Sequence, residues 1–154
     1  MISDSPVDFR PDGSIAFTID DVKIRWRSPK VKHVRSHRNN YQTLVRTSQD
    51  LVAPFSLRDD DGRVVNAEYI AALTTKKDVD KWTKALTSFE IDQDAYADAK
   101  AEVDQLLADW IIDVHNDLVL EGTIPLDADE WPYWLLSLQF AGKTVQHWGG
   151  NPFA

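Results

Sequence analysis

The C-terminal stretch from Glu130 to Ala154 constrains the fold most, because it gains aromatic surface where most chains become polar and loosely ordered. Three of the six tryptophans of the chain lie in it, and after Glu130 the only fully charged side chain is Lys143. Such a segment must dock on the body of the protein, on a second copy or on a partner, or close the core of its own domain. The residues that we predict to bind a partner are Trp131, Tyr133, Trp134, Leu135, Phe140, Val145 and Trp148.

The length and composition of the chain limit the classes to which it can belong. A chain of 154 residues can bury a substantial core, and the absence of cysteine excludes disulfides, thiolate nucleophiles and cysteine-based zinc sites. We expect neither a leader peptide nor a transmembrane segment, and therefore no membrane partner. The net charge of −8 argues against non-specific affinity for nucleic acid.

Charge is distributed very unevenly along the chain. Residues 22–49 contain eight Lys or Arg and no acid, whereas residues 89–130 contain thirteen Asp or Glu and a single basic residue, Lys100. Either both blocks are solvated faces, or they pair within the chain or between subunits of a homo-oligomer, or each block meets a separate partner. Binding of the basic block to nucleic acid is the less favoured alternative. The predicted charged pairing surface comprises Arg25, Arg27, Lys30, Lys32, Arg35 and Arg38.

The hydrophobic pattern predicts an α+β fold that is mainly helical, with an N-terminal β-hairpin followed by about five helices. Apolar residues alternate on both sides of Asp20-Asp21, which indicates a hairpin. After Ser28-Pro29 the apolar spacing becomes helical up to Pro54, with a possible interruption near residues 39–40. Further helices are expected after Asn66, after Thr75, over about 95–120, after Pro132 and over 140–148.

The same pattern suggests three regions along the chain. Residues 1–12 contain several aspartates and two prolines, and we expect a flexible arm there. Residues 13–129 form the α+β body, and residues 130–154 form the aromatic C-terminal segment.

The sequence contains no arrangement that is typical of an active site. The acids of Asp59–Asp61 before Gly62 are contiguous, whereas a calcium loop needs alternating ligands. His33 and His37 have a two-ligand helical spacing but lack a third ligand. A phosphate loop and a nucleophile elbow are also missing. We therefore predict a protein that is not an enzyme and that has no cofactor and no metal.

Both ends of the chain resemble tail assembly chaperones of long-tailed, siphovirus-type phages that infect actinobacteria. At the N-terminal end the resemblance rests on Phe17-Thr-Ile-Asp-Asp-Val-Lys-Ile-Arg-Trp-Arg-Ser-Pro-Lys30, a hairpin followed by a basic step into a helix. At the C-terminal end it rests on Trp131-Pro-Tyr-Trp-Leu135 and His147-Trp-Gly-Gly-Asn-Pro152. The family often has Arg directly after His-Trp, where this chain has Gly149.

The resemblance implies a non-catalytic function. Such chaperones bind the long, helix-rich tape measure protein in the host cytoplasm, keep it soluble before the tail tube polymerises, and are absent from the mature virion. Family members are often made in two lengths by a programmed ribosomal frameshift, and codons for Gly149-Gly150-Asn151 can contain a slippery heptamer. A frameshift-extended form of the chain is therefore a second expected partner. The alternatives are a small nucleic-acid-binding or acidic decoy regulator and a structural virion protein.

Overall fold

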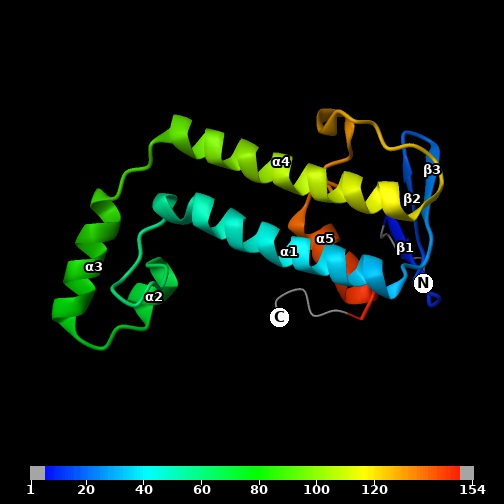
Figure 1. Cartoon of the computed structure of the whole chain (residues 1–154). Coiled ribbons are helices and arrows are strands. Elements are labelled where there is room, and N and C mark those ends of the chain that lie inside the picture. The colour runs from blue at the N-terminus through cyan, green and yellow to red at the C-terminus, as the bar shows by residue number, and fades with distance from the viewer. Residues whose placement is uncertain (1–5, 150–154) are drawn as a thin grey trace. The chain divides into compact units, whose positions relative to one another are not determined.

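A computed structural model describes residues 6–149 of the chain (Figure 1). A four-stranded antiparallel sheet and a larger set of helices make up these residues, and three strands precede the first helix, so the predicted α+β, mainly helical fold is confirmed. The chain divides into two compact units, residues 1–47 together with 103–154, and residues 48–102. The division falls within the two longest helices, whereas the sequence pattern had suggested a boundary at residue 130.

The sheet has the strand order β1-β2-β3-β4. The predicted hairpin is present as β2 (Ile15–Ile19) and β3 (Val22–Trp26), and Ile19 pairs with Val22 across a two-residue loop. Asp20 and Asp21 both have positive φ, 46° and 65°. This is the geometry of a tight type I′ turn, which aspartate tolerates better than most residues do.

The two edge strands of the sheet were not predicted. Strand β1 (Val7–Phe9) pairs with β2, and Val7 is buried, so the expectation of a flexible arm is wrong for these residues. Strand β4 (Val119–Glu121) pairs with β3 where the sequence pattern predicted the end of a helix. Both strands have only three residues, too few for an alternating pattern to be recognised, and each forms because a neighbouring strand offers backbone partners.

Three helices complete the first unit: α1 (Val31–Val52) up to residue 47, α4 (Gln93–Leu118) from residue 103, and α5 (Leu138–His147). Within this unit α1 and α4 lie side by side and run in opposite directions (Figure 1). The Trp110 indole on α4 donates a hydrogen bond of 2.9 Å to the backbone oxygen of His37 on α1. Helix α1 continues through residues 39–40 without the predicted interruption, because its apolar face is buried along this stretch.

The remaining turns of the first unit are short. The structure has turns and bends over residues 133–137, where a helix was predicted after Pro132, and a short 3-10 turn, η2 (Ala128–Glu130), just before that proline. Helix α5 ends at His147 with Trp148 as its C-cap, and the next residue, Gly149, has the φ of +83° that is typical after a helix C-cap. The core joins one face of the sheet to α1, α4 and α5. Its largest fully buried side chains are Trp26, Tyr41, Ile15, Ile19, Ile24, Ile111, Leu118, Leu135, Val114, Val145 and Thr144.

The second unit contains η1 (Ala53–Phe55), α2 (Ala67–Ala71) and α3 (Lys76–Ser88), besides the ends of α1 and α4. The predicted N-caps are present. The Asn66 side chain accepts a hydrogen bond from the backbone of α2 at 2.9 Å, and that of Thr75 accepts one from α3 at 3.3 Å. Asp59 accepts backbone hydrogen bonds from Asp61 and Arg63, so the acidic triplet forms a polar turn.

Candidate functional site

A groove of about 280 Å³ lies between β1 and the segment that leads into α5, within the first unit. Four aromatic rings give it an apolar character, and Lys143 is its only charged lining residue. The lining residues are Pro6, Val7, Phe9, Tyr133, Trp134, Ser137, Gln139, Phe140 and Lys143.

The start of α5 holds the aromatic wall of this groove in place. The Ser137 hydroxyl donates a hydrogen bond to the Trp134 backbone oxygen at 2.7 Å and accepts one from the Phe140 backbone at 3.1 Å. The rings of Trp134 and Phe140 meet edge to face with centroids 5.6 Å apart. Phe17 from the sheet packs edge to face against both rings, at 5.6 and 5.9 Å. Such packing restricts the rotamers, so the wall is largely preformed.

The structure separates the predicted partner-binding residues into two groups. Leu135 and Val145 are fully buried, and Trp131 and Phe140 are nearly so, which places these four in the core. The Trp131 indole donates a hydrogen bond of 2.6 Å to the backbone oxygen of Pro125. A free partner therefore cannot reach most of this set.

The other three predicted residues remain accessible to different degrees. Tyr133 is 90% exposed at the groove, and Trp134 beside it is partly buried. Trp148 is also partly buried but packs against His37, with ring centroids 6.3 Å apart, and does not line the groove.

Sequence reasoning missed the β1 side of the groove. Val7 and Phe9 line it from a strand that had been assigned to a flexible arm. The available signal was the alternation of Val7 and Phe9 with Asp8, which is a single repeat of the strand period. Residues 150–154, including part of the His147–Pro152 motif and of the proposed frameshift site, lie outside the described residues.

The basic block contacts the acidic block at only a few points. Arg25 and Glu121 form an ion pair at 3.7 Å between β3 and β4, and the Arg27 guanidinium donates a hydrogen bond of 3.1 Å to the Asp117 backbone oxygen. His37 lies 2.6 Å from the Asp117 carboxylate, measured from Nε2 to Oδ2. Of the predicted pairing surface, five residues form no ion pair with any other residue of 6–149: Arg27, Lys30, Lys32, Arg35 and Arg38.

A second polar contact is buried beneath the sheet. The fully buried Trp26 donates its indole N–H to Nδ1 of His115 at 2.9 Å. An indole is only a donor, so Nδ1 must be unprotonated and the neutral ring must carry its proton on Nε2. Burial lowers the pKa of His115 from its ordinary value of 6.5, because a charged ring is disfavoured away from water.

This pair predicts that acid destabilises the fold. Above pH 6.5, the ordinary pKa of histidine, His115 is neutral in both the folded and the unfolded chain. Its contribution to the free energy of unfolding is then at its full value. As the pH falls below this value the unfolded chain takes up the proton first, so the free energy of unfolding decreases toward the lowered pKa of the folded state. Urea unfolding across this range should show the decrease.

The matched variant for this measurement is His115→Asn. Its side-chain oxygen can accept the Trp26 hydrogen bond near the position of Nδ1, and it does not titrate. Between neutral and mildly acidic pH, the free energy of unfolding of this variant should therefore depend less on pH than that of the wild-type protein. Identical slopes in the two proteins would show that His115 does not carry the effect.

The described residues contain no group of three or more His, Cys, Asp or Glu side chains arranged to hold a metal ion. Among the helices within residues 6–149, none combines the length and the apolar character that crossing a bilayer requires. Comparison with protein-family models, with curated proteins and with solved structures finds no match for the chain.

Proposed function

We propose that this chain is a non-catalytic tail assembly chaperone that binds a tape measure protein and keeps it soluble before the tail tube polymerises. The observation that carries the proposal is the aromatic groove beside β1, with Tyr133 90% exposed at its edge. A large exposed ring next to an apolar groove is unusual on a surface that contacts only water. The proposal also rests on the resemblance of residues 17–30 and 131–152 to this class of chaperone.

The groove is suited to an apolar helical stripe. A helix-rich partner presents apolar side chains three and four residues apart, and exposed stripes of this kind associate with one another in water. A groove of about 280 Å³ has room for a few such side chains at a time. Tyr133 and Trp134 have only two side-chain torsions each, so fixing them on a partner costs little conformational entropy.

Lys143 is expected to influence which stripe is bound. It is the only charged residue of the groove and forms no ion pair with any residue of 6–149. A partner segment with an acidic residue beside its apolar stripe would place that residue near the ammonium group. The apolar contacts would supply most of the affinity, so the complex should persist at high salt.

The test is co-expression with the tape-measure-like protein that the resemblance predicts to be encoded downstream, followed by pull-down in low and high salt. The wild-type chain should retain the partner in the soluble fraction under both conditions. Tyr133→Ala should weaken the complex by about tenfold or more, because exposed aromatic anchors often dominate such interfaces. Leu126→Ala is the matched control, since Leu126 is 83% exposed but does not line the groove.

The proposal fails if the chain forms no complex, or if Tyr133→Ala and Leu126→Ala bind the partner equally well. A complex that dissociates at high salt would instead indicate binding through a charged surface, as expected for a nucleic-acid-binding or acidic decoy regulator. Recovery of the chain from purified particles would favour a structural virion protein. Deletion of residues 130–154 is a poor test because it removes buried core residues such as Leu135.

A further inference from the structure

The N-terminal half of α1 has a basic face that forms no ion pair with the described part of the chain. Lys32, Arg35 and Arg38 follow one another at intervals of three residues, so their side chains lie along one side of the helix. Lys32 and Arg35 are exposed and Arg38 is partly buried, and none of the three forms an ion pair within residues 6–149. These three residues are called the basic face below.

The position of this face is unfavourable for the helix that carries it. Helix α1 begins at Val31 and has no acidic residue in its first turn, where Lys32 lies. The N-terminus of a helix is the positive end of its dipole, so a cation there is destabilising. By contrast, the Asp117 carboxylate in the last turn of α4 has a polar partner, because its Oδ2 lies 2.6 Å from Nε2 of His37. Lys32 has no such partner among the described residues.

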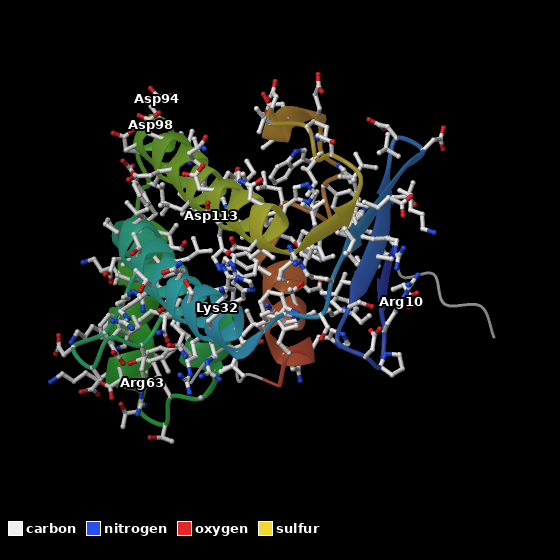
Figure 2. All side chains as sticks on the ribbon, turned by 45° about the vertical axis from the view of Figure 1, so that its right-hand side comes forward. Arg10, Lys32, Arg63, Asp94, Asp98 and Asp113 are labelled. Atoms are coloured by element: carbon white, nitrogen blue, oxygen red, sulfur yellow. The ribbon has the colours of Figure 1, made fainter. Side chains whose placement is uncertain are left out.

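A complementary surface lies in the same unit, on α4. A shallow groove of about 180 Å³ between α1 and α4 has Asp109 and Asp113 on its α4 rim and includes no basic residue in its lining. Asp109 accepts a hydrogen bond of 2.8 Å from Gln105, and Asp113 forms no ion pair within residues 6–149. Figure 2 shows Asp113 on α4 and Lys32 on α1, the two helices that run side by side. Asp109 and Asp113 are called the acidic rim below.

The two surfaces match in spacing and chemistry. Carboxylates four residues apart are separated by about 6 Å along a helix axis, and cations three residues apart by about 4.5 Å. Flexible Lys and Arg side chains easily accommodate this difference. The planar guanidinium of Arg35 can bind a carboxylate through two hydrogen bonds. Its aliphatic stem can pack on Leu106 and Trp110, which also line the groove.

We propose that the basic face of one copy binds the acidic rim of a second copy, so that the chain self-associates through α1 and α4. A second copy satisfies both surfaces at once, because every copy supplies one of each. Nucleic acid would satisfy only the basic face and would meet a chain of net charge −8. This inference does not depend on the proposed chaperone function, since neither surface includes a residue of the aromatic groove.

The proposal is tested by sedimentation velocity at increasing salt concentration, with the wild-type protein and two charge-reversal variants. Lys32→Glu/Arg35→Glu reverses the basic face, and Asp109→Arg/Asp113→Arg reverses the acidic rim. Wild-type protein should associate at low salt and dissociate as salt screens the pairs. Each reversed variant alone should associate at least about tenfold more weakly, because like charges then oppose one another. An equimolar mixture of the two variants should associate again, since the reversed surfaces complement each other.

Two controls separate loss of pairing from loss of folding. Lys77→Glu/Lys84→Glu lowers the net charge by the same amount at exposed positions of α3 that belong to neither surface, and should not change the association. The melting temperature of Lys32→Glu/Arg35→Glu should stay the same or rise, because the new acids suit the N-terminal end of α1.

Three results would overturn the proposal. The first is a wild-type protein that remains monomeric at every salt and protein concentration. The second is association that the reversals do not weaken, or that the mixture of variants does not restore. The third is a monomeric protein that binds a labelled single-stranded oligonucleotide and loses this binding in Lys32→Glu/Arg35→Glu, which would assign the basic face to nucleic acid.

Discussion

Replacing Gly122 with alanine is expected to destabilise the protein by about 3 kcal/mol or more, a large part of the stability of a typical domain. Gly122 directly follows β4 and has a φ of +89°, which non-glycine residues rarely adopt. A Cβ atom there would overlap the backbone oxygen of Lys23 and lie 2.6 Å from Cδ1 of Ile24. The backbone oxygen belongs to β3 and cannot rotate away. Either the β3–β4 pairing or the packing of Ile24 must therefore be distorted to make room for the new atom.

Gly62→Ala is the matched control for this substitution. Gly62 also has a positive φ, +81°, but a Cβ there would meet no atom within 4 Å. Its cost should be limited to backbone strain, about 1 kcal/mol. Urea unfolding of both variants measures the two costs, and their difference isolates the steric overlap at β3. Equal costs for Gly122→Ala and Gly62→Ala would contradict the described approach of β4 to β3.

Leu135→Ala is expected to reduce the free energy of unfolding by about 2–5 kcal/mol. Leu135 is fully buried in the middle of the aromatic segment, among core side chains of the first unit. Truncation to alanine removes its apolar contacts and leaves a cavity that the rigid aromatic packing around it cannot readily fill. Denaturant unfolding monitored by tryptophan fluorescence should show a lower midpoint with a similar slope.

Leu126→Ala provides the same chemical change at an exposed position. Leu126 is 83% exposed, so its truncation should change stability by less than about 0.5 kcal/mol. A large difference between the two variants would establish that residues around Leu135 belong to the core. If Leu135→Ala were as mild as Leu126→Ala, the aromatic segment would not be docked as described, and buried residues such as Trp131 would again be candidates for partner binding.

The burial of this segment changes how a binding surface should be sought. Its apolar residues have two roles: buried ones such as Leu135 belong to the core, whereas those at the groove, notably Tyr133 and Trp134, can contact a partner without unfolding the chain. Point substitutions at exposed positions therefore test binding, whereas truncations test folding. The same distinction applies to the basic block, where Arg25 and Arg27 contact the chain itself and Lys32 and Arg35 are available for another molecule.

Local chemistry explains why much of the helical and hairpin structure was predictable. The hairpin turns at Asp20-Asp21 because short alternating runs lie on both sides of residues that tolerate positive φ. Helices α2 and α3 begin where Asn66 and Thr75 can cap them, and Asp92 accepts backbone hydrogen bonds at the start of α4. Each of these signals acts within about four residues and needs no distant partner.

The candidate site was predictable only in part. The sequence pattern singled out the aromatic C-terminal segment, but periodicity could not tell Tyr133, which is exposed, from Leu135, which is buried two residues later. The other wall of the groove comes from Val7 and Phe9, more than a hundred residues away in sequence. Which side chain faces solvent depends on how these distant segments pack, and no local pattern contains that information.

The sequence by itself therefore determined the α+β class, the hairpin, the starts of α2 and α3 and the unequal distribution of charge. Only the tertiary structure decided the two edge strands, the burial of Trp131, Leu135, Phe140 and Val145, and which residues of the basic block contact the chain itself. The physical reason is the range of the interactions. Caps, turns and helical stripes act between near neighbours, whereas β1, β4 and the groove depend on contacts between segments that meet only after folding.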